Sequence, residues 1–296
     1  MSLESSLAAV EVVVVDEKEL SAFTRESQHF RVAFNLFRET AGYVCILANT
    51  TVGPTQSWNI GQAVLGGHLV RMFKLMRFAM EESIERREEM LSVLIRLIAE
   101  CVINLRYLIL NGSPELVRSY LAYSLQHEKE LASLIRTNIK DRGGEVLPIE
   151  ERMLRSIART FAKSQLSEDD LPAKKIRNWG EKNLFEKAKA VGLGDAYTAI
   201  FGGPSRNVHG GWHDLLQYHL EYDEPGMFRP KLEFKRPRPQ PIYSLTHLIA
   251  ETLEGYVDLL NHPGLSEVAD RLRDLDERNY TASDAHERYL VAKHAV

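Results

Sequence analysis

Residues 91–110 of this 296-residue chain read LSVLIRLIAECVINLRYLIL, and this stretch decides the fold class. Apolar residues recur along it every three or four positions, which is the spacing of one face of an α-helix. The length would suit a membrane span, but two arginines, a glutamate and an asparagine within it would each be costly in hydrocarbon. The stretch therefore predicts a buried helix of a soluble domain.

Helical spacing of apolar residues extends over most of the rest of the chain. It predicts further helices over about residues 62–89, 114–141, 148–164, 181–191 and 244–260. Strand signals are confined to residues 10–15, which are β-branched, and to residues 231–235, which lie between prolines. We therefore expect an all-α fold, a multi-helix bundle with a proline-rich basic loop and little or no strand.

The sequence suggests two parts, an N-terminal helical cap or arm over residues 1–58 and a main bundle domain over residues 59–296. Residues 221–241 (EYDEPGMFRPKLEFKRPRPQP) contain five prolines and are expected to form an irregular basic loop, because proline blocks helix formation. A helix that ends near Asp276 is expected to be followed by a charged, frayed tail over residues 280–296.

The composition narrows the classes of protein. The formal net charge of -4 argues against a protein that coats nucleic acid, so any nucleic-acid contact has to be a local basic patch. Cys45 and Cys101 have no CxxC spacing and provide neither a zinc site nor a disulfide framework. Acidic Glu4 and Glu11 stand where a signal peptide would be basic, so we expect a cytoplasmic chain with no membrane partner.

Residues 204–214 (PSRNVHGGWHD) carry the candidate chemistry of the chain. Arg206 can clamp a phosphate with two hydrogen bonds, and Asn207 directly follows it. A histidine titrates near neutral pH and can move protons, and His213 and His209 are the candidates here. Because a 2′-hydroxyl deprotonated by histidine can attack its own phosphate, RNA cleavage at such a site requires no metal.

Two other interpretations of these histidines stay open. His209 and His213 are four positions apart, a spacing of metal ligands on one helix face, with Asp214 or His219 as the third ligand. The two glycines between them disfavour the helix that this geometry needs, and we expect no metal or other cofactor. Alternatively, one of these histidines is hydrogen-bonded inside the fold and has a structural role.

A polar row crosses the otherwise apolar helix at residues 91–110. Arg96, Glu100 and Asn104 are four positions apart and form a row on one side of the helix. One interpretation is an internal ion pair plus an amide that fixes the packing of the helix. The other is a set of groups that orients a catalytic side chain.

The positive charge of the proline-rich loop offers a candidate nucleic-acid contact. Its basic residues could meet a phosphate backbone, although such a run is usually a solvated loop. These residues are Arg229, Lys231, Lys235, Arg236 and Arg238.

Several of these segments together resemble a known family. The helix at 96–108 is similar to the arginine–glutamate signature helix of the mainly bacterial family catalogued as domain of unknown function 5677. The second half of that family is matched by Trp179, the run 186–193 (EKAKAVGL), Tyr197, Ser205 and His209-Gly210. The resemblance covers roughly residues 60–225, departs from the family at the glycine-rich residues 201–204, and implies a helical fold.

The arginine–histidine spacing is also distantly similar to HEPN domains, which are helical bundles that often form dimers. Their ribonuclease members carry an arginine, a polar residue and then a histidine, a pattern that Arg206, Asn207 and His213 match. This resemblance implies metal-independent RNA cleavage at a homodimer seam, in a defence or toxin–antitoxin setting. His213, with His209 as second choice, would be the acid–base group, Arg206 would stabilise charge, and Asn207 would position the phosphate. The residues expected to support them are Arg96, Glu100, Asn104, Tyr197 and Ser205.

The alternative is a non-catalytic helical protein that binds another protein or acts as a sensor. In that case Arg96, Glu100 and His209 would form a buried structural network. RNA, a second copy of the chain and an antitoxin or other protein are therefore all expected partners.

Overall fold

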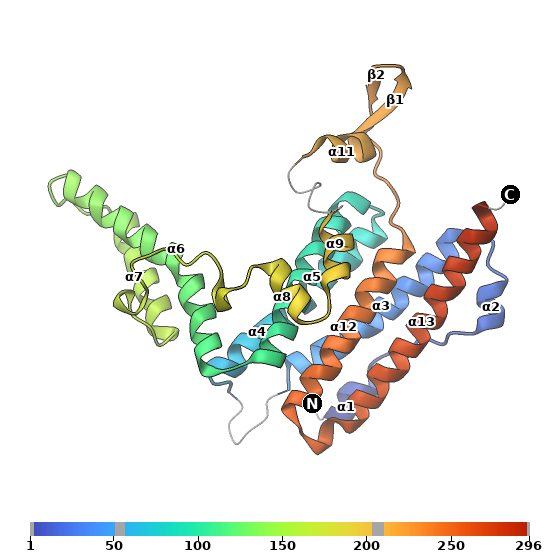
Figure 1. Ribbon diagram of the computed structural model, residues 1–296, viewed down its shortest axis with the longest axis horizontal. Helices are drawn as coiled ribbons and strands as arrows, with labels where there is room; N and C mark the ends of the chain where they lie inside the picture. The colour runs from blue at the N-terminus through green and yellow to red at the C-terminus, as the bar shows by residue number, and fades with distance from the viewer. Residues whose placement is uncertain (1–2, 51–56, 203–209, 295–296) are drawn as a thin grey trace.

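The computed structural model describes residues 3–50, 57–202 and 210–294. Within these residues the chain is helical apart from one β-hairpin, so the predicted all-α, multi-helix fold is confirmed (Figure 1). The α-helices are α1 (Leu3–Ala8), α2 (Glu17–Ser21), α3 (Glu26–Ala48), α4 (Ile60–Ile84), α5 (Glu88–Asn111), α6 (Pro114–Asp141), α7 (Pro148–Lys163), α8 (Leu184–Ala190), α9 (Gly194–Gly202), α11 (Trp212–Asp214), α12 (Pro239–Leu260) and α13 (Ser266–His294). The short turns are η1 (Glu168–Asp170), η2 (Trp179–Glu181), η3 (Leu215–His219) and η4 (Pro263–Leu265), and the strands are β1 (Leu220–Glu224) and β2 (Met227–Pro230).

The main core is built from α3, α4, α5, α12 and α13. Helix α5 is the stretch that decides the fold class, and Ile98, Val102 and Leu105 on it are fully buried. It packs against α4 on one side and α12 on another, while α3 packs against α4, α12 and α13. Helix α3, from the N-terminal 58 residues, therefore shares one hydrophobic core with the rest of the bundle.

Local sequence signals set where these helices begin. The Asn59 side chain accepts a hydrogen bond from the backbone of Gln62 and caps α4 at 3.0 Å. Ser113 caps α6 in the same way, and Pro114 occupies its first turn, where no backbone donor is needed. These caps satisfy backbone donors that the first turn of a helix leaves free.

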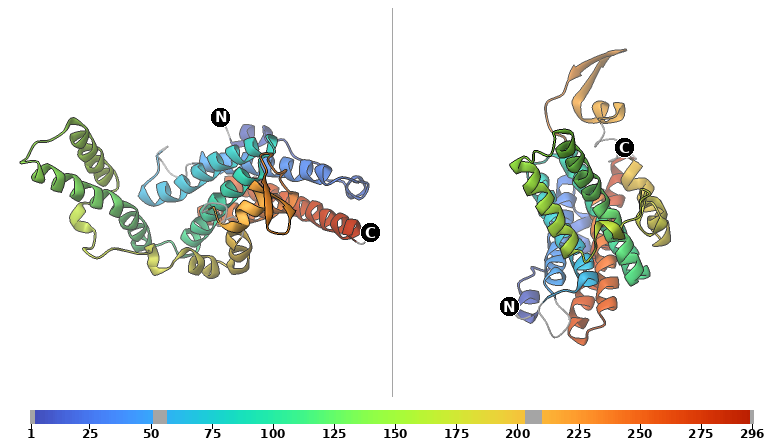
Figure 2. Two further views of the ribbon diagram at one scale, coloured as in Figure 1. Left: turned by 90° about the horizontal axis from the view of Figure 1, so that it is seen from above. Right: turned by 90° about the vertical axis from the view of Figure 1, so that its left-hand side faces the viewer.

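Two parts of the chain project from this core (Figures 1 and 2). Helices α6 and α7 form a hairpin with a small core of its own, in which Ala132, Ile157 and Phe161 are buried. On another side, α11, η3, β1 and β2 form a projection over residues 212–230, which we call the arm. In its antiparallel hairpin Leu220 stands opposite Pro230.

The proline-rich segment is only partly irregular. Its first half forms the hairpin of the arm, its second half runs in irregular conformation along the bundle, and α12 begins at Pro239. The strand signals at residues 10–15 and 231–235 do not form strands. Among the described residues, residues 10–15 pair with no strand, and the pairing of β1 with β2 ends at Pro230, so neither segment gains a ladder of hydrogen bonds.

The prediction of a frayed C-terminal tail is wrong for the residues that the structure describes. Helix α13 continues without a break to His294. Ala282, Ala285 and His286 recur at helical spacing and are buried, and α13 packs against α3 and α12. The charged residues of this segment lie on the outer face of a helix whose inner face is buried.

None of the helices in the described residues has the length and apolar character that a membrane span requires.

Candidate functional site

The motif at residues 204–214 lies largely outside the described residues. Ser205, Arg206, Asn207 and His209 are in the segment 203–209, which the structure does not describe. His213 lies on α11, and its side chain is exposed and able to meet a ligand from solvent.

The end of the motif contacts the turn that follows it. Asp214 is buried, and its carboxylate lies 3.6 Å from the imidazole of His219. Among the described residues, no three histidine, cysteine or acidic side chains gather as a metal site would require. The proposed ligand His209 is not among those residues.

The predicted polar row on α5 does not form an ion pair. No salt bridge joins Arg96 and Glu100 in the described part of the chain; instead the Arg96 guanidinium lies over the Phe201 ring, 5.6 Å from its centroid. The Tyr197 ring stacks on the same Phe201 with ring centroids 4.4 Å apart. Arg96 and Tyr197 therefore both contact Phe201, which lies in the last turn of α9. Asn104 is buried, and its side-chain oxygen has no partner in the described residues.

Glu100 belongs to a separate cluster with α8 and η2. Lys187 is buried, and its ammonium lies 3.4 Å from the ring centroid of Trp179, with the Tyr107 ring also near. Burial lowers the pKa of Lys187 to about 8, although the charge of Glu100 acts in the opposite direction. Trp179 is itself packed edge-on against Tyr107 and Tyr120, so this cluster fixes η2 and α8 to the bundle.

A cavity of about 740 Å³ with many basic side chains lies at the surface of the described structure. We call it the basic groove. Three segments line it: the start of α3, the turn between α4 and α5, and the chain before α12. The lining residues are Arg25, Glu26, Ser27, Phe30, Arg31, Phe34, Ser83, Ile84, Arg86, Lys235, Arg236, Pro237 and Arg238.

The groove gathers six basic side chains around one acidic side chain, Glu26. That carboxylate lies 3.7 Å from the imidazole of His286. Lys235 is paired with Glu88 at 3.5 Å. The other five cations form no salt bridge with any carboxylate in the described residues; they are Arg25, Arg31, Arg86, Arg236 and Arg238.

Five guanidiniums without a salt bridge give the groove a positive potential, which attracts anions. Arg38, by contrast, pairs with Glu11 at 2.8 Å. Arginine donates hydrogen bonds from a planar fork that matches phosphate geometry. The groove therefore has the charge and the donor geometry that a phosphate group requires.

Backbone contacts hold the basic segment 235–238 in place. The backbone N–H of Glu88 donates to the carbonyl oxygen of Lys235 at 3.0 Å, which ties this segment to the start of α5. The Lys235 ammonium also lies over the Tyr218 ring, 5.3 Å from its centroid. Across the groove, Arg86 has a φ of 60°, a left-handed conformation that L-residues other than glycine, asparagine and aspartate rarely adopt. This conformation turns the chain sharply between α4 and α5.

Aromatic rings form part of the groove lining. The Phe30 and Phe34 rings lie one turn apart on α3, with centroids 6.5 Å apart and ring planes 29° apart. Both side chains are only partly buried. Proteins that bind single-stranded nucleic acids combine aromatic rings with cationic groups. A base stacks on the ring while its phosphate contacts the positive charge.

The five basic residues predicted to contact nucleic acid lie in two different places in the structure. Lys235, Arg236 and Arg238 enter the basic groove. Arg229 is instead paired with Asp223 on the arm at 2.7 Å, and Lys231 lies outside the groove, where its backbone N–H donates to His219. Arg25, Arg31 and Arg86 were not predicted from the sequence, because they lie far from residues 235–238 along the chain and join them only in the folded structure.

Comparison with known proteins gives one match. The model of a family described as "Family of unknown function (DUF5677)" matches residues 62–227, which run from α4 to the hairpin of the arm. Searches of curated proteins and of solved structures give no significant match. The matched segment covers more than half of the chain and includes the α5 helix, Trp179 and Tyr197. The chain therefore belongs to the family of unknown function DUF5677.

Proposed function

We propose that this chain binds single-stranded RNA in the basic groove and cleaves it without a metal ion. The observation that carries the proposal is the convergence of five arginines without carboxylate partners beside the Phe30 and Phe34 rings. In a chain with a net charge of -4, such a patch is a local exception to the overall charge. Phosphates would meet the guanidiniums, and one or two bases would stack on the phenylalanines.

Cleavage would use the residues of the 204–214 motif. His213 accepts the proton of a 2′-hydroxyl, and the oxygen attacks the adjacent phosphorus. The bond from phosphorus to the 5′-oxygen breaks, and that oxygen takes a proton from a general acid, for which His209 is the candidate. Arg206 stabilises the charge that develops on the phosphate, and Asn207 positions it. The products are a 2′,3′-cyclic phosphate and a 5′-hydroxyl.

Two features of the structure support this assignment of roles. His213 is exposed, so a strand can reach it. The chain that carries His213 continues through Tyr218, whose ring contacts Lys235 at the groove, so the motif and the groove are linked by one short segment. In the HEPN-like arrangement a second copy of the chain would complete the site.

Binding and cleavage can be tested separately. End-labelled single-stranded RNA is incubated in EDTA with the wild type and with Arg206→Ala and His213→Ala variants, and fragment ends are analysed. We expect EDTA-resistant fragments with cyclic phosphate ends from the wild type and none from either variant, while both variants still bind RNA. His262→Ala, which removes a distant histidine, is the control and should cleave normally.

Groove binding is tested by charge reversal. The double variant Arg31→Glu/Arg236→Glu should lose binding in a fluorescence anisotropy titration, because two cations become anions that repel phosphate. Arg152→Glu/Arg159→Glu, at two exposed sites of α7, makes the same charge change outside the groove and should bind normally. Equal binding by Arg31→Glu/Arg236→Glu and the wild type would overturn the proposed function. Binding without cleavage by the wild type would overturn its catalytic part.

A second function, non-catalytic binding of a protein, is favoured by the arm. Trp212, Tyr222 and Met227 are each more than half exposed, and the Phe228 ring contacts both Trp212 and Tyr222 edge-on. An isolated two-stranded hairpin is only marginally stable in water, so a partner that covers these rings would stabilise it. The partner we propose is a second copy of the chain. Light scattering would then give a dimer for the wild type and a monomer for Phe228→Ser.

A further inference from the structure

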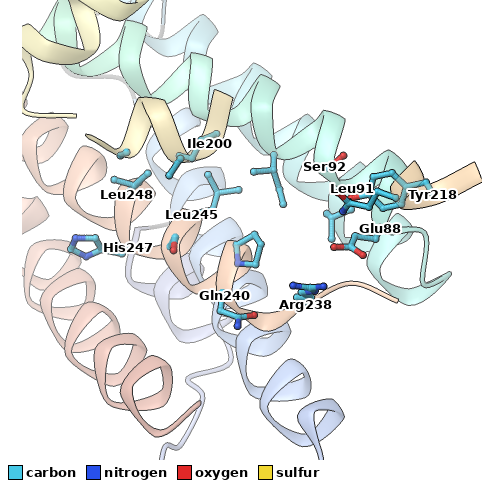
Figure 3. Close-up of a pocket in the computed structure, with 16 residues that line it drawn as sticks. Glu88, Leu91, Ser92, Ile200, Tyr218, Arg238, Gln240, Leu245, His247 and Leu248 are labelled. Carbon is cyan, nitrogen blue, oxygen red and sulfur yellow. The ribbon is translucent and has the colours of Figure 1, made fainter. Parts of the chain in front are cut away.

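A second cavity, of about 530 Å³, lies between α5, α9 and α12, and the short turn η3 closes one end (Figure 3). Its volume is typical of sites for small organic groups. Most of the wall is apolar, and the apolar lining residues are Leu91, Ile95, Ala196, Ala199, Ile200, Pro241, Leu245 and Leu248. Such a wall favours a flat, weakly polar group over a hydrated ion.

Polar groups gather at the end where α5 begins and α12 starts. Glu88, Arg238 and Gln240 line this end of the cavity (Figure 3). The side-chain oxygen of Gln240 is buried and has no hydrogen-bond partner in the described residues. A buried acceptor without a donor is unfavourable, so a ligand that donates an N–H to this oxygen would stabilise this end of the cavity. Glu88 supplies a second acceptor, although it also pairs with Lys235.

Arg238 connects this cavity to the basic groove. Its side chain lines both cavities, and it forms no salt bridge in the described part of the chain. A phosphate held by Arg238 would therefore stand at the boundary between them. The group attached to that phosphate could lie on the apolar wall, while the remainder of the strand follows the groove.

We propose that the cavity accepts one unstacked nucleobase of the strand bound in the basic groove. This inference rests on the proposed function. The apolar wall contacts the faces of the base, the Gln240 oxygen and the Glu88 carboxylate accept N–H groups from its edge, and Arg238 binds the adjacent phosphate. The free energy needed to unstack a base is small in a single strand, and burial of the base on the apolar wall offsets it.

The test uses single-stranded RNA 12-mers that carry one 2-aminopurine at successive positions. The fluorescence of this base is quenched by stacking on its neighbours, and an aliphatic cavity relieves the quenching. We expect a several-fold increase in fluorescence at one position when the wild type binds, and little change at the others. Strand binding is followed in parallel by the anisotropy of an end label.

Filling the cavity should remove the fluorescence signal. The double variant Ala199→Leu/Ser244→Leu adds apolar bulk from two facing walls and introduces no aromatic quencher, so we expect the increase to disappear while the groove still binds the strand. Thr198→Leu changes the neighbouring position on α9, which does not line the cavity, and should behave as the wild type.

The outcomes separate the inference from the proposed function. Strand binding with no fluorescence increase at any position, or an increase that persists in the filled variant, would overturn the nucleobase pocket and leave the groove as the binding site. No strand binding by the wild type would overturn both. An increase at one position that only the filled variant loses would support both.

Discussion

Arg278 and Glu39 form the most buried ion pair of the described structure, and breaking it should destabilise the fold strongly. The Glu39 side chain is fully buried and the Arg278 side chain is 15% exposed. Both nitrogens of the guanidinium fork donate to Glu39 at 2.8 Å. Arg278 also donates to the carbonyl oxygen of Val13, and the Val13 N–H donates to Glu39, so the pair attaches the N-terminal segment to α3 and α13.

The expected magnitude follows from what each substitution leaves behind. Arg278→Ala leaves the carboxylate buried with two donors, the Val13 N–H and the Tyr43 hydroxyl. Removing one partner of a buried ion pair is unfavourable by about 3–5 kcal/mol. Because the two remaining hydrogen bonds offset part of this, we expect a loss of about 3 kcal/mol in the free energy of unfolding.

The assay is urea unfolding followed by circular dichroism, with the midpoint and slope fitted together. Arg273→Ala is the matched control, since it breaks a surface pair between Arg273 and Asp270 on the same helix and should lower the free energy of unfolding by less than about 1 kcal/mol. The double variant Glu39→Leu/Arg278→Met should recover part of the loss because no charge stays buried. A change below 1 kcal/mol for Arg278→Ala would refute this reasoning.

Three further predictions concern single positions. In Gly66→Ala the new methyl group would stand 2.5 Å from the Trp58 ring, so the free energy of unfolding in urea should fall by about 1–3 kcal/mol. Gly67→Ala places its methyl group in free space and should raise the same free energy by about 1 kcal/mol. Burial lowers the pKa of His68 from 6.5 to about 4, so the unfolded chain alone binds a proton between these values. The free energy of unfolding should therefore be greatest above pH 6.5 and decrease as the pH falls toward 4. Over this pH range the urea midpoint of His68→Phe should fall less than that of the wild type. Arg86→Gly replaces an arginine in the left-handed conformation by a residue that adopts it without strain. We expect an unchanged or slightly higher free energy of unfolding in urea, and weaker RNA binding by anisotropy. A clear loss of stability would contradict the strain that we assign to Arg86.

The helices of the core were predictable because their signals are local. The apolar spacing of residues 91–110 is enough to place α5, and Ser113-Pro114 is enough to place the start of α6. The C-terminal part of α13 was missed because its buried positions are small or polar, such as Ala282 and His286, and their burial depends on the helices that pack against them. A hydropathy pattern cannot register burial of this kind.

The basic groove was only half predictable for a related reason. Arg236 and Arg238 stand in a run of basic residues, which is a local signal. Arg25 and Arg31 are isolated in the sequence and Arg86 stands beside Arg87 alone, so all three resemble ordinary surface arginines. These arginines have no carboxylate partner in the described structure, and this gives the groove its charge. Whether an arginine has such a partner depends on the folded chain.

The salt dependence of RNA binding tests the central claim most directly. If a single strand contacts the five unpaired arginines, the logarithm of the association constant should fall against the logarithm of salt concentration with a slope of about -3.5, from about 0.7 per phosphate contact. Between 50 and 200 mM NaCl the affinity should then fall about 100-fold, and the slope should shrink to about -2 in Arg31→Ala/Arg236→Ala. A slope near zero in the wild type, or the same slope in both proteins, would contradict the account.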